Sequence, residues 1–248
     1  DAEISKRLVI EINTRLKFML DVGLNYLSLN RISYTLSGGE IQRIHLTRSL
    51  GSNLTSSLSV LDEPSIGLHP RDSLRLIEVL KKLRDVGNSV IVVEHDEEMM
   101  KSADMIIDIG PEAGRYGGEI VFKGTHNQLM SSKKSLTAKY LTGKLAIEVP
   151  KVRRKPKDFI IIEEAYLHNL KNITVKIPLN QICVITGVSG SGKSTLVGGV
   201  LFNFLERYFL TGLEKVSHCK NIKVNLDLIN GVEFINQNPI GKSSRSNP

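Results

Sequence analysis

The 248-residue sequence contains no apolar run that approaches the roughly 20 residues needed to cross a bilayer. Its first residues also lack the basic segment and apolar stretch of a secretory signal peptide, and the chain does not begin with methionine. These absences predict a cytoplasmic protein that does not insert into membranes. The missing start suggests that the chain is a piece of a longer protein.

Cysteine is scarce, because the sequence has only Cys183 and Cys219, which lie far apart and form no CxxC pair. A structural zinc site needs about four ligands, commonly in paired spacings, so the sequence predicts no zinc site. Few cysteines also fit a reducing compartment. Cys183 lies in an apolar run, which predicts a thiol buried in the core.

The formal net charge is +7, which favours an anionic partner such as a nucleotide or a nucleic acid. The densest basic cluster is KVRRKPK at 151–157. A solvated linker is the simpler interpretation of this cluster, and a strip that contacts phosphates is the alternative.

Apolar periodicity predicts helices that alternate with short β-branched strands, which is typical of an α/β fold with a parallel or mixed sheet and flanking helices. The expected helices are residues 4–20, 42–50, 70–86, 96–102 and 193–205. The expected strands are residues 57–61, 89–93, 105–109, 159–162, 173–177 and 181–186. Of these, 57–61 is expected to be buried, and 159–162 and 173–177 are expected to form a hairpin. Within the third helix, Leu74, Ile77, Leu80 and Leu83 are expected to form one buried stripe.

A change in composition marks a domain boundary. Residues 131–158 are rich in Lys, Ser and Thr and end in the basic cluster, so a linker is expected there between domains at 1–130 and 159–248.

The stretch GVSGSGKS at 187–194 fits the pattern GxxxxGK[ST] between an expected strand and an expected helix. Glycines allow backbone N–H groups to surround phosphate oxygens, and the helix N-terminus favours negative charge. Lys193 should reach the β- and γ-phosphates, and the Ser194 hydroxyl should bind Mg²⁺. A chance glycine-rich turn is the alternative. The predicted nucleotide-binding residues are Gly187, Ser189, Gly190, Ser191, Gly192, Lys193, Ser194 and Thr195.

Two acids end the strand expected at 57–61. Asp62 is suited to hold Mg²⁺, and Glu63 is placed to polarise a water for attack on the γ-phosphate. His95 follows the next expected strand, so it should lie at the same carboxyl edge of the sheet. An acid pair at a strand end is common, and a lone histidine is more often structural.

The stretch LSGGEIQR at 36–43 opens the second expected helix, and Ser37 with Glu40 forms a capping-box pattern that explains part of it. The stretch as a whole resembles the signature of ABC-type ATPases. That resemblance implies P-loop modules in which ATP lies between the phosphate loop of one module and the signature of another. The matching signature residues are Ser37, Gly38, Gly39 and Glu40, of which Ser37 and Gly39 would touch the γ-phosphate.

Longer stretches resemble the UvrA family of excinuclease proteins within that superfamily: DEPSIGLHPRD at 62–72, DIGPEAG at 108–114 and PIG at 239–241. His69 stands where transporter ATPases usually carry Asp. By the same resemblance, Gln237 is the glutamine-loop residue, near Mg²⁺ and the attacking water.

The order of the motifs is reversed relative to a single ABC module, because the signature, acids and histidine precede the phosphate loop. The resemblance therefore implies two partial modules: residues 1–130 as the C-terminal part of the first and residues 159–248 as the N-terminal part of the second. We expect weak nucleotide binding and poor hydrolysis by this chain alone, unless the two parts dock into one permuted module.

The resemblance implies an ATPase of DNA excision repair that recognises DNA damage and uses ATP and Mg²⁺. Its implied partners are DNA, the B component of the excinuclease and a second copy of itself. Two alternatives remain open at this point: the ATPase of a membrane transporter, and a non-catalytic nucleotide-binding fragment.

Overall fold

The computed structural model describes residues 2–33, 36, 38–51, 55–214 and 216–235. The chain divides into two compact units, Asp1–Pro150 and Lys151–Pro248, and each has its own buried core. In the described part of the chain, helices combine with one parallel and two antiparallel sheets. This mixture confirms the α/β class predicted from the sequence.

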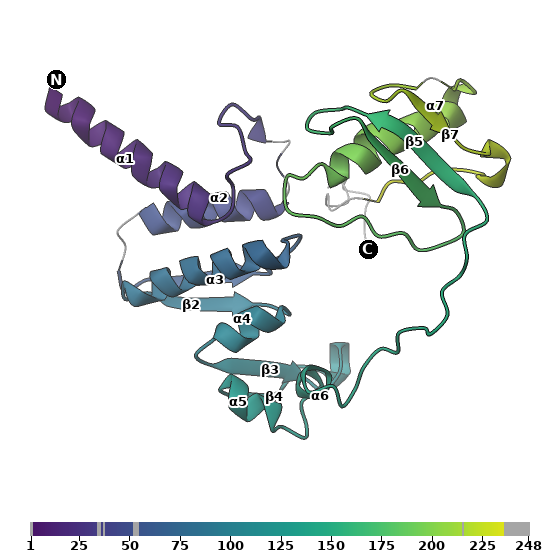
Figure 1. Ribbon diagram of the computed structural model, residues 1–248. Coiled ribbons are helices and arrows are strands. Elements are labelled where there is room, and N and C mark those ends of the chain that lie inside the picture. The colour runs from purple at the N-terminus through teal and green to yellow at the C-terminus, as the bar shows by residue number, and fades with distance from the viewer. Residues whose placement is uncertain (1, 34–35, 37, 52–54, 215, 236–248) are drawn as a thin grey trace. The chain divides into compact units, whose positions relative to one another are not determined.

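The first part of unit 1 is a helix layer on a parallel strand pair. Its elements are α1 (Ala2–Asp21), α2 (Gly38–Gly51), β1 (Leu58–Asp62), α3 (Pro70–Asp85), β2 (Ser89–Val93) and α4 (Glu97–Ser102). β1 pairs with β2 so that Asp62 lies opposite Val93, and α3 runs alongside the pair (Figure 1). Leu61 and the partly buried Val90 and Val92 join the apolar side of α3 in one core.

The other face of this strand pair is bare. Leu58, Val60, Ile91 and Val93 are between 49% and 65% exposed. The prediction of a buried strand at 57–61 is therefore wrong for half of its side chains. Side chains alternate between the two faces of a strand, and the described residues cover only the face that meets α3.

Helix α3 confirms three of the four residues expected on its buried stripe, because Ile77, Leu80 and Leu83 are at most 7% exposed. Leu74, expected on the buried stripe with Leu83, is 52% exposed, whereas Leu76 is fully buried. Because each residue turns the helix by about 100°, three steps of three residues carry the series from Leu74 round to the opposite side at Leu83. The helix begins at Pro70, after His69 Nδ1 accepts a hydrogen bond from the Arg71 amide.

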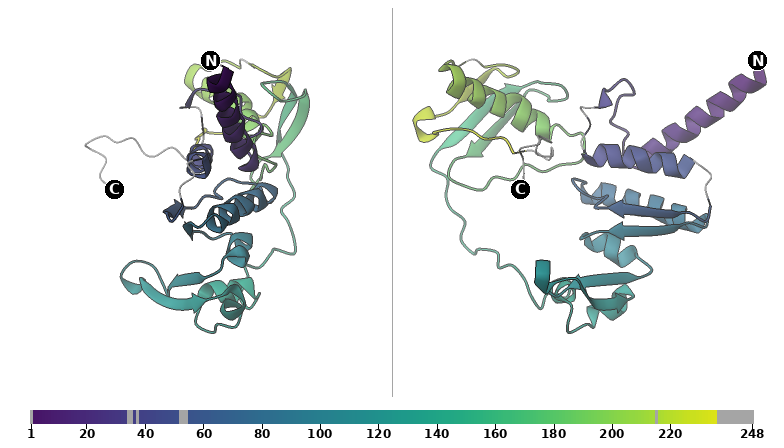
Figure 2. Two further views of the ribbon diagram at one scale, coloured as in Figure 1. Left: turned by 90° about the vertical axis from the view of Figure 1, so that its left-hand side faces the viewer. Right: turned by 180° about the vertical axis from the view of Figure 1, so that it is seen from behind.

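Helix α1 confirms the helix expected at 4–20, but it projects away from the other elements of unit 1 (Figures 1 and 2). Ile4, Leu8, Ile12 and Leu20 are each more than half exposed. Only the C-terminal end of α1 leads into the core, through Val22 and Leu24.

The second part of unit 1 is built on an antiparallel pair. β3 (Ile106–Gly110) pairs with β4 (Glu119–Gly124), which the sequence analysis missed, and the 3₁₀ turn Gly114–Tyr116 lies between them. The helices α5 (His126–Met130) and α6 (Leu136–Leu141) follow.

The first part of the predicted linker at 131–158 is folded. Ser135 is fully buried at the N-terminus of α6, and its hydroxyl donates to Asp108 Oδ2 at 2.5 Å. Thr137 Oγ1 donates to the other carboxylate oxygen of Asp108 at 3.1 Å. These bonds hold α6 to β3, so this part of the predicted linker contains a packed helix. Residues 142–158 contain no helix or strand, and the boundary between the two units, at Pro150 and Lys151, lies within them.

Unit 2 places a helix across a three-stranded antiparallel sheet (Figure 2, right). The sheet has the order β6 (Ile173–Pro178), β5 (Phe159–Ala165), β7 (Asn221–Lys223), which confirms the expected hairpin and adds a third strand. The helix expected at 193–205 is a π-helix over Thr195–Phe202 that continues as α7 (Asn203–Thr211). A 3₁₀ turn, Leu226–Leu228, follows β7. Ile162, Val200 and Phe204 are central to the core of this unit.

The strand predicted at 181–186 is absent. Ile182 and Val184 are 96% and 78% exposed, and Cys183 is exposed rather than buried as expected. A strand is completed by hydrogen bonds to a neighbour, and no strand pairs with this segment in the described part of unit 2. The buried thiol is Cys219 instead, and burial raises its pKa.

Candidate functional site

The carboxyl ends of β1 and β2 bring two of the predicted catalytic residues together. Asp62 ends β1, and the Glu63 amide continues the ladder by donating to the Val93 carbonyl at 2.9 Å. Glu63 adopts a left-handed backbone, with φ of 45°. His95 follows β2, and its Nε2 lies 3.8 Å from Glu63 Oε1. Parallel pairing therefore places the acids and the histidine on one edge, as the sequence analysis expected.

Glu94, which was not among the residues predicted from the sequence, supports this edge. Its carboxylate accepts backbone hydrogen bonds from Ser65 at 2.8 Å, His95 at 3.0 Å and Asp96 at 3.3 Å. Partial burial alone would raise the pKa of Glu94, but the hydrogen bonds from Ser65, His95 and Asp96 outweigh it and lower the pKa. Glu94 thus ties the loop after β1 to the loop after β2. Its position directly before His95 is the one feature of the sequence that could have pointed to this role.

The signature helix is fastened to the acidic strand. Gln42 of α2 donates from Nε2 to the backbone carbonyl of Asp62 at 2.7 Å, which leaves the exposed Asp62 carboxylate available. A Cβ at Gly39 would lie 3.0 Å from the carbonyl oxygen of Ile66, so only glycine allows α2 this close to the loop after the acids. Neither contact could be read from spacing, because both depend on how α2 packs against β1.

Glu40 lies inside the unit rather than in the solvent. It is 6% exposed, accepts a hydrogen bond from the Tyr26 hydroxyl at 2.7 Å, and pairs with Arg31 at 3.7 Å. Burial and the bond to Glu40 raise the pKa of Tyr26 to about 12, so this phenol stays protonated as a donor. Glu40 therefore orients the start of α2. The structure extends α2 to Gly38, but Ser37 lies outside the described residues.

The predicted phosphate loop folds as a turn closed by its own lysine. Lys193 Nζ donates to the carbonyls of Gly187 at 2.7 Å and Val188 at 2.9 Å. Gly190 and Gly192 have φ of 75° and 103°, values that a side chain would make costly. The chain turns helical at Lys193, so Ser194 and Thr195 stand at the start of a helix, as expected.

The oxygen ligands available for Mg²⁺ are the exposed carboxylate of Asp62 in unit 1 and the exposed hydroxyl of Ser194 in unit 2. Carboxylate and hydroxyl oxygens are ligands that Mg²⁺ prefers, so each of these side chains suits an ion bound by its own unit. Gln237, the third predicted ligand, lies outside the described residues. Within the described ranges, no group of three or more His, Cys, Asp or Glu side chains could hold a metal ion.

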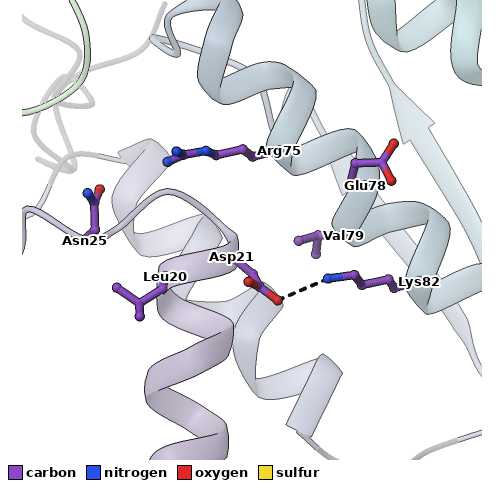
Figure 3. A pocket seen from close by; sticks show the side chains of 7 residues that line it. All are labelled: Leu20, Asp21, Asn25, Arg75, Glu78, Val79 and Lys82. Carbon is purple, nitrogen blue, oxygen red and sulfur yellow. Dashed lines mark hydrogen bonds and ion pairs between the residues drawn. The ribbon is translucent and has the colours of Figure 1, made fainter.

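A separate pocket of about 410 Å³ lies between α1 and α3 (Figure 3). It is lined by Leu20, Asp21, Asn25, Arg75, Glu78, Val79 and Lys82. The lining carries two acids and two bases, and Asp21 pairs with Lys82 at 3.2 Å. This balance of charge gives the pocket no preference for a polyphosphate. We assign it to the packing of α1 rather than to nucleotide binding.

The helices of the described segments include none that is long and apolar enough to span a membrane. No family model matches the chain.

Known proteins resemble the chain along its whole length. It is 54% identical over 246 residues to UvrABC system protein A of Aquifex aeolicus, covering 99% of this chain and 26% of that protein. It is 50% identical over 254 residues to UvrABC system protein A of Thermus thermophilus, covering 100% of this chain and 26% of that protein. The crystal structure of UvrA2 from Deinococcus radiodurans matches with a TM-score of 0.86 and 39% identity, over 97% of this chain and 29% of that one. The chain thus spans about a quarter of the length of these curated relatives, and it belongs to the family of UvrABC system protein A.

Proposed function

We propose that this chain is the ATP-handling segment of a UvrA-type DNA-repair ATPase. The observation that carries the proposal is the turn closed by Lys193, which presents its glycines directly ahead of a helix N-terminus. Backbone N–H groups at such a junction bind anions, and a lysine beside them neutralises phosphate charge. ATP is the ligand that the surrounding motif favours.

Unit 2 would bind the polyphosphate. Lys193 gives up its two carbonyl partners and turns to the β- and γ-phosphates, while the amides of the loop surround the phosphate oxygens. Gly187, Ser189, Gly190, Ser191 and Gly192 supply that loop. Ser194 provides a hydroxyl ligand for Mg²⁺, and Thr195 continues the helix behind it. The ion would neutralise the charge that develops on the phosphates.

Unit 1 would supply the groups that act on water, at the nucleotide site of the first module rather than at the Lys193 loop of unit 2. Glu63 accepts the proton of the attacking water, and Asp62 offers its carboxylate to the metal. His95, 3.8 Å from Glu63, is placed to contact the γ-phosphate or to orient Glu63. The signature residues Gly38, Gly39 and Glu40 start the helix that Gln42 fastens to Asp62. Ser37 and Gln237 complete the proposed set.

In our proposal the two units are parts of two ABC-type modules, with the end of the first at 1–130 and the start of the second at 159–248. The relatives are named as parts of a UvrABC system. By that kinship the parent protein would hydrolyse ATP, bind damaged DNA, associate with the B component of the excinuclease and pair with a second copy. Its setting would be the cytoplasm.

A non-catalytic role is the second candidate for the 248 residues alone. The largely exposed segment 181–186, which leads directly into the phosphate loop, has no strand beside it in the described part of unit 2. A loop whose supporting strand is unpaired is less rigidly held, which favours binding without turnover.

One experiment separates these candidates: equilibrium binding of Mg²⁺–ATP and steady-state hydrolysis by the chain, with Lys193→Ala and Glu63→Gln alongside. Lys176→Ala and Glu119→Gln are matched controls on exposed residues away from the loop and the acids. Binding that Lys193→Ala abolishes, without turnover, supports a nucleotide-binding segment that lacks a complete catalytic site. Turnover that both Lys193→Ala and Glu63→Gln abolish shows instead that the chain itself is catalytic. Binding that survives Lys193→Ala contradicts the proposed site.

A further inference from the structure

The turn between β5 and β6 reaches the phosphate loop through Asn169. Its Nδ2 donates to the carbonyl of Gly190 at 2.9 Å. A Cβ placed on Gly192 would lie 2.9 Å from Leu170 Cδ2 and 3.0 Å from Asn169 Oδ1. Two points of the loop, Gly190 and Gly192, therefore touch this one turn.

The turn that carries Asn169 is itself firmly held. Leu170 is 8% exposed within the core of unit 2, and its amide donates to the Leu167 carbonyl at 3.0 Å. His168 and Asn172 adopt left-handed backbones, with φ of 52° and 49°, which fixes the sharp reversal on either side. Asn169 is thus presented from a rigid support rather than from a mobile surface loop.

The bond from Asn169 sets the orientation of the peptide between Gly190 and Ser191. In a trans peptide the carbonyl and the N–H point in opposite directions. Because the Gly190 carbonyl is directed to Asn169, the Ser191 N–H is directed to the interior of the loop, where it donates to Val188 at 3.1 Å. Val188 also accepts from Lys193, so this N–H and the lysine converge on one carbonyl.

Gly190 makes this orientation easy to lose. With φ of 75° and no Cβ, its backbone can rotate with little steric resistance. Rotation of the peptide would turn the Ser191 N–H outwards and aim a carbonyl oxygen at the place where phosphate oxygens would bind. An oxygen in that position repels an anion, so a fixed peptide favours binding before any ligand arrives.

We propose that Asn169 is a positioning residue for polyphosphate, which holds the Gly190–Ser191 peptide with its N–H turned into the loop. This inference rests on the proposed function, because it takes the loop as the phosphate site. Asn169 touches the loop rather than the ligand, so its effect passes through the orientation of the Ser191 amide.

The test uses the full chain and the variant Asn169→Leu, which keeps the branched shape and the number of side-chain heavy atoms but removes the donor. Asn203→Leu is the matched control, because Asn203 also donates to a glycine carbonyl, that of Gly199 at 3.0 Å. Lys193→Ala serves as the reference for the site itself. The probes are Mg²⁺–ATP and inorganic tripolyphosphate, with the thermal midpoint and the Ser191 amide resonance recorded for each variant.

We expect Asn169→Leu to raise the Kd for both probes about three- to tenfold, the worth of one net hydrogen bond. The Ser191 amide resonance should shift in the ligand-free variant, while Asn203→Leu leaves the Kd and that resonance unchanged. Equal affinity in Asn169→Leu and the wild type, with binding lost in Lys193→Ala, would overturn the role of Asn169 but keep the nucleotide site. A large fall in the thermal midpoint of Asn169→Leu would overturn it in favour of a structural role. Binding unaffected by Lys193→Ala would instead sink the proposed function.

Discussion

Two segments that precede candidate functional residues, one in each unit, have similar sequences and different structures. Residues 58–62 and 182–186 are both short apolar runs that precede functional residues, but the first is strand β1 and the second has no ladder. β1 pairs with β2 along five residues, and Gln42 and Glu94 fasten its end. The comparison shows that an apolar run can form a strand only where a neighbouring strand is available to accept and donate its backbone hydrogen bonds.

The largest expected difference concerns core packing. Leu61→Ala in β1 removes a buried side chain and should lower the free energy of unfolding by about 2–4 kcal/mol. Ile182→Ala lies in residues 182–186, which we call the bare segment because no strand pairs with it. This change should alter the free energy of unfolding by less than about 0.5 kcal/mol. Chemical denaturation of both variants checks the contrast. A loss of similar size for Ile182→Ala would mean that the segment is packed.

The next prediction concerns how the stability of unit 1 depends on pH through Glu94, which fastens the end of β1. The folded state lowers the pKa of Glu94, so its stabilising effect is present above the ordinary glutamate pKa and is lost as the pH falls through the lowered value. Glu94→Gln should destabilise unit 1 by about 1 kcal/mol at pH 7, since it removes a charged acceptor.

The gap between the wild type and Glu94→Gln should then narrow in acid, below the ordinary glutamate pKa, when unfolding is followed from pH 7 downwards. Glu119→Gln, on an exposed strand position, is the control and should behave as the wild type at every pH. A gap that stays constant from pH 7 into acid would show that the charge of Glu94 is not what stabilises this edge.

Breaking the hydrogen bond between α2 and the end of β1 should have a smaller effect on the free energy of unfolding. Gln42→Leu removes the bond to the Asp62 carbonyl and should cost about 1 kcal/mol. Gln181→Leu removes a similar bond, to the Arg154 carbonyl at 2.9 Å, at the start of the bare segment. Because that segment is not paired with another strand, loss of the Gln181 bond should lower the free energy of unfolding by less than about 0.5 kcal/mol. Equal costs in thermal unfolding would remove the distinction drawn between the two segments.

Thiol chemistry probes the bare segment with almost no change in stability. Exposed Cys183 should react rapidly with a disulfide reagent, whereas buried Cys219, whose pKa burial raises, should react slowly. Cys183→Ser should abolish the fast phase. A slow, single phase for both thiols in the native protein would place 182–186 in a buried strand.

The sequence was a good guide wherever a local pattern carries the whole signal. The helix starts after His69 and at Lys193 and the strands of the β5–β6 hairpin follow from local periodicity. The edge shared by Glu63 and His95 follows from the rule that functional residues lie at the carboxyl ends of parallel strands. Side-chain partners such as Glu94, Gln42 and Asn169 were missed, because each depends on contacts between segments distant in the chain.

Errors of burial have a common physical cause. Leu58, Cys183 and Leu74 were expected inside and are exposed, since hydrophobicity predicts a preference for burial without saying which face finds a neighbour. Helix α6, inside the predicted linker, shows the opposite error, because polar residues expected in solvent are packed. The hydroxyls of Ser135 and Thr137 donate hydrogen bonds to the carboxylate of Asp108.

The central claim is that the turn closed by Lys193 is a polyphosphate site. Calorimetric titration of the wild-type chain and Lys193→Ala with Mg²⁺–ATP tests it most directly. We predict measurable binding by the wild type, also by Lys176→Ala, and none by Lys193→Ala. Equal binding by all three proteins would contradict the account.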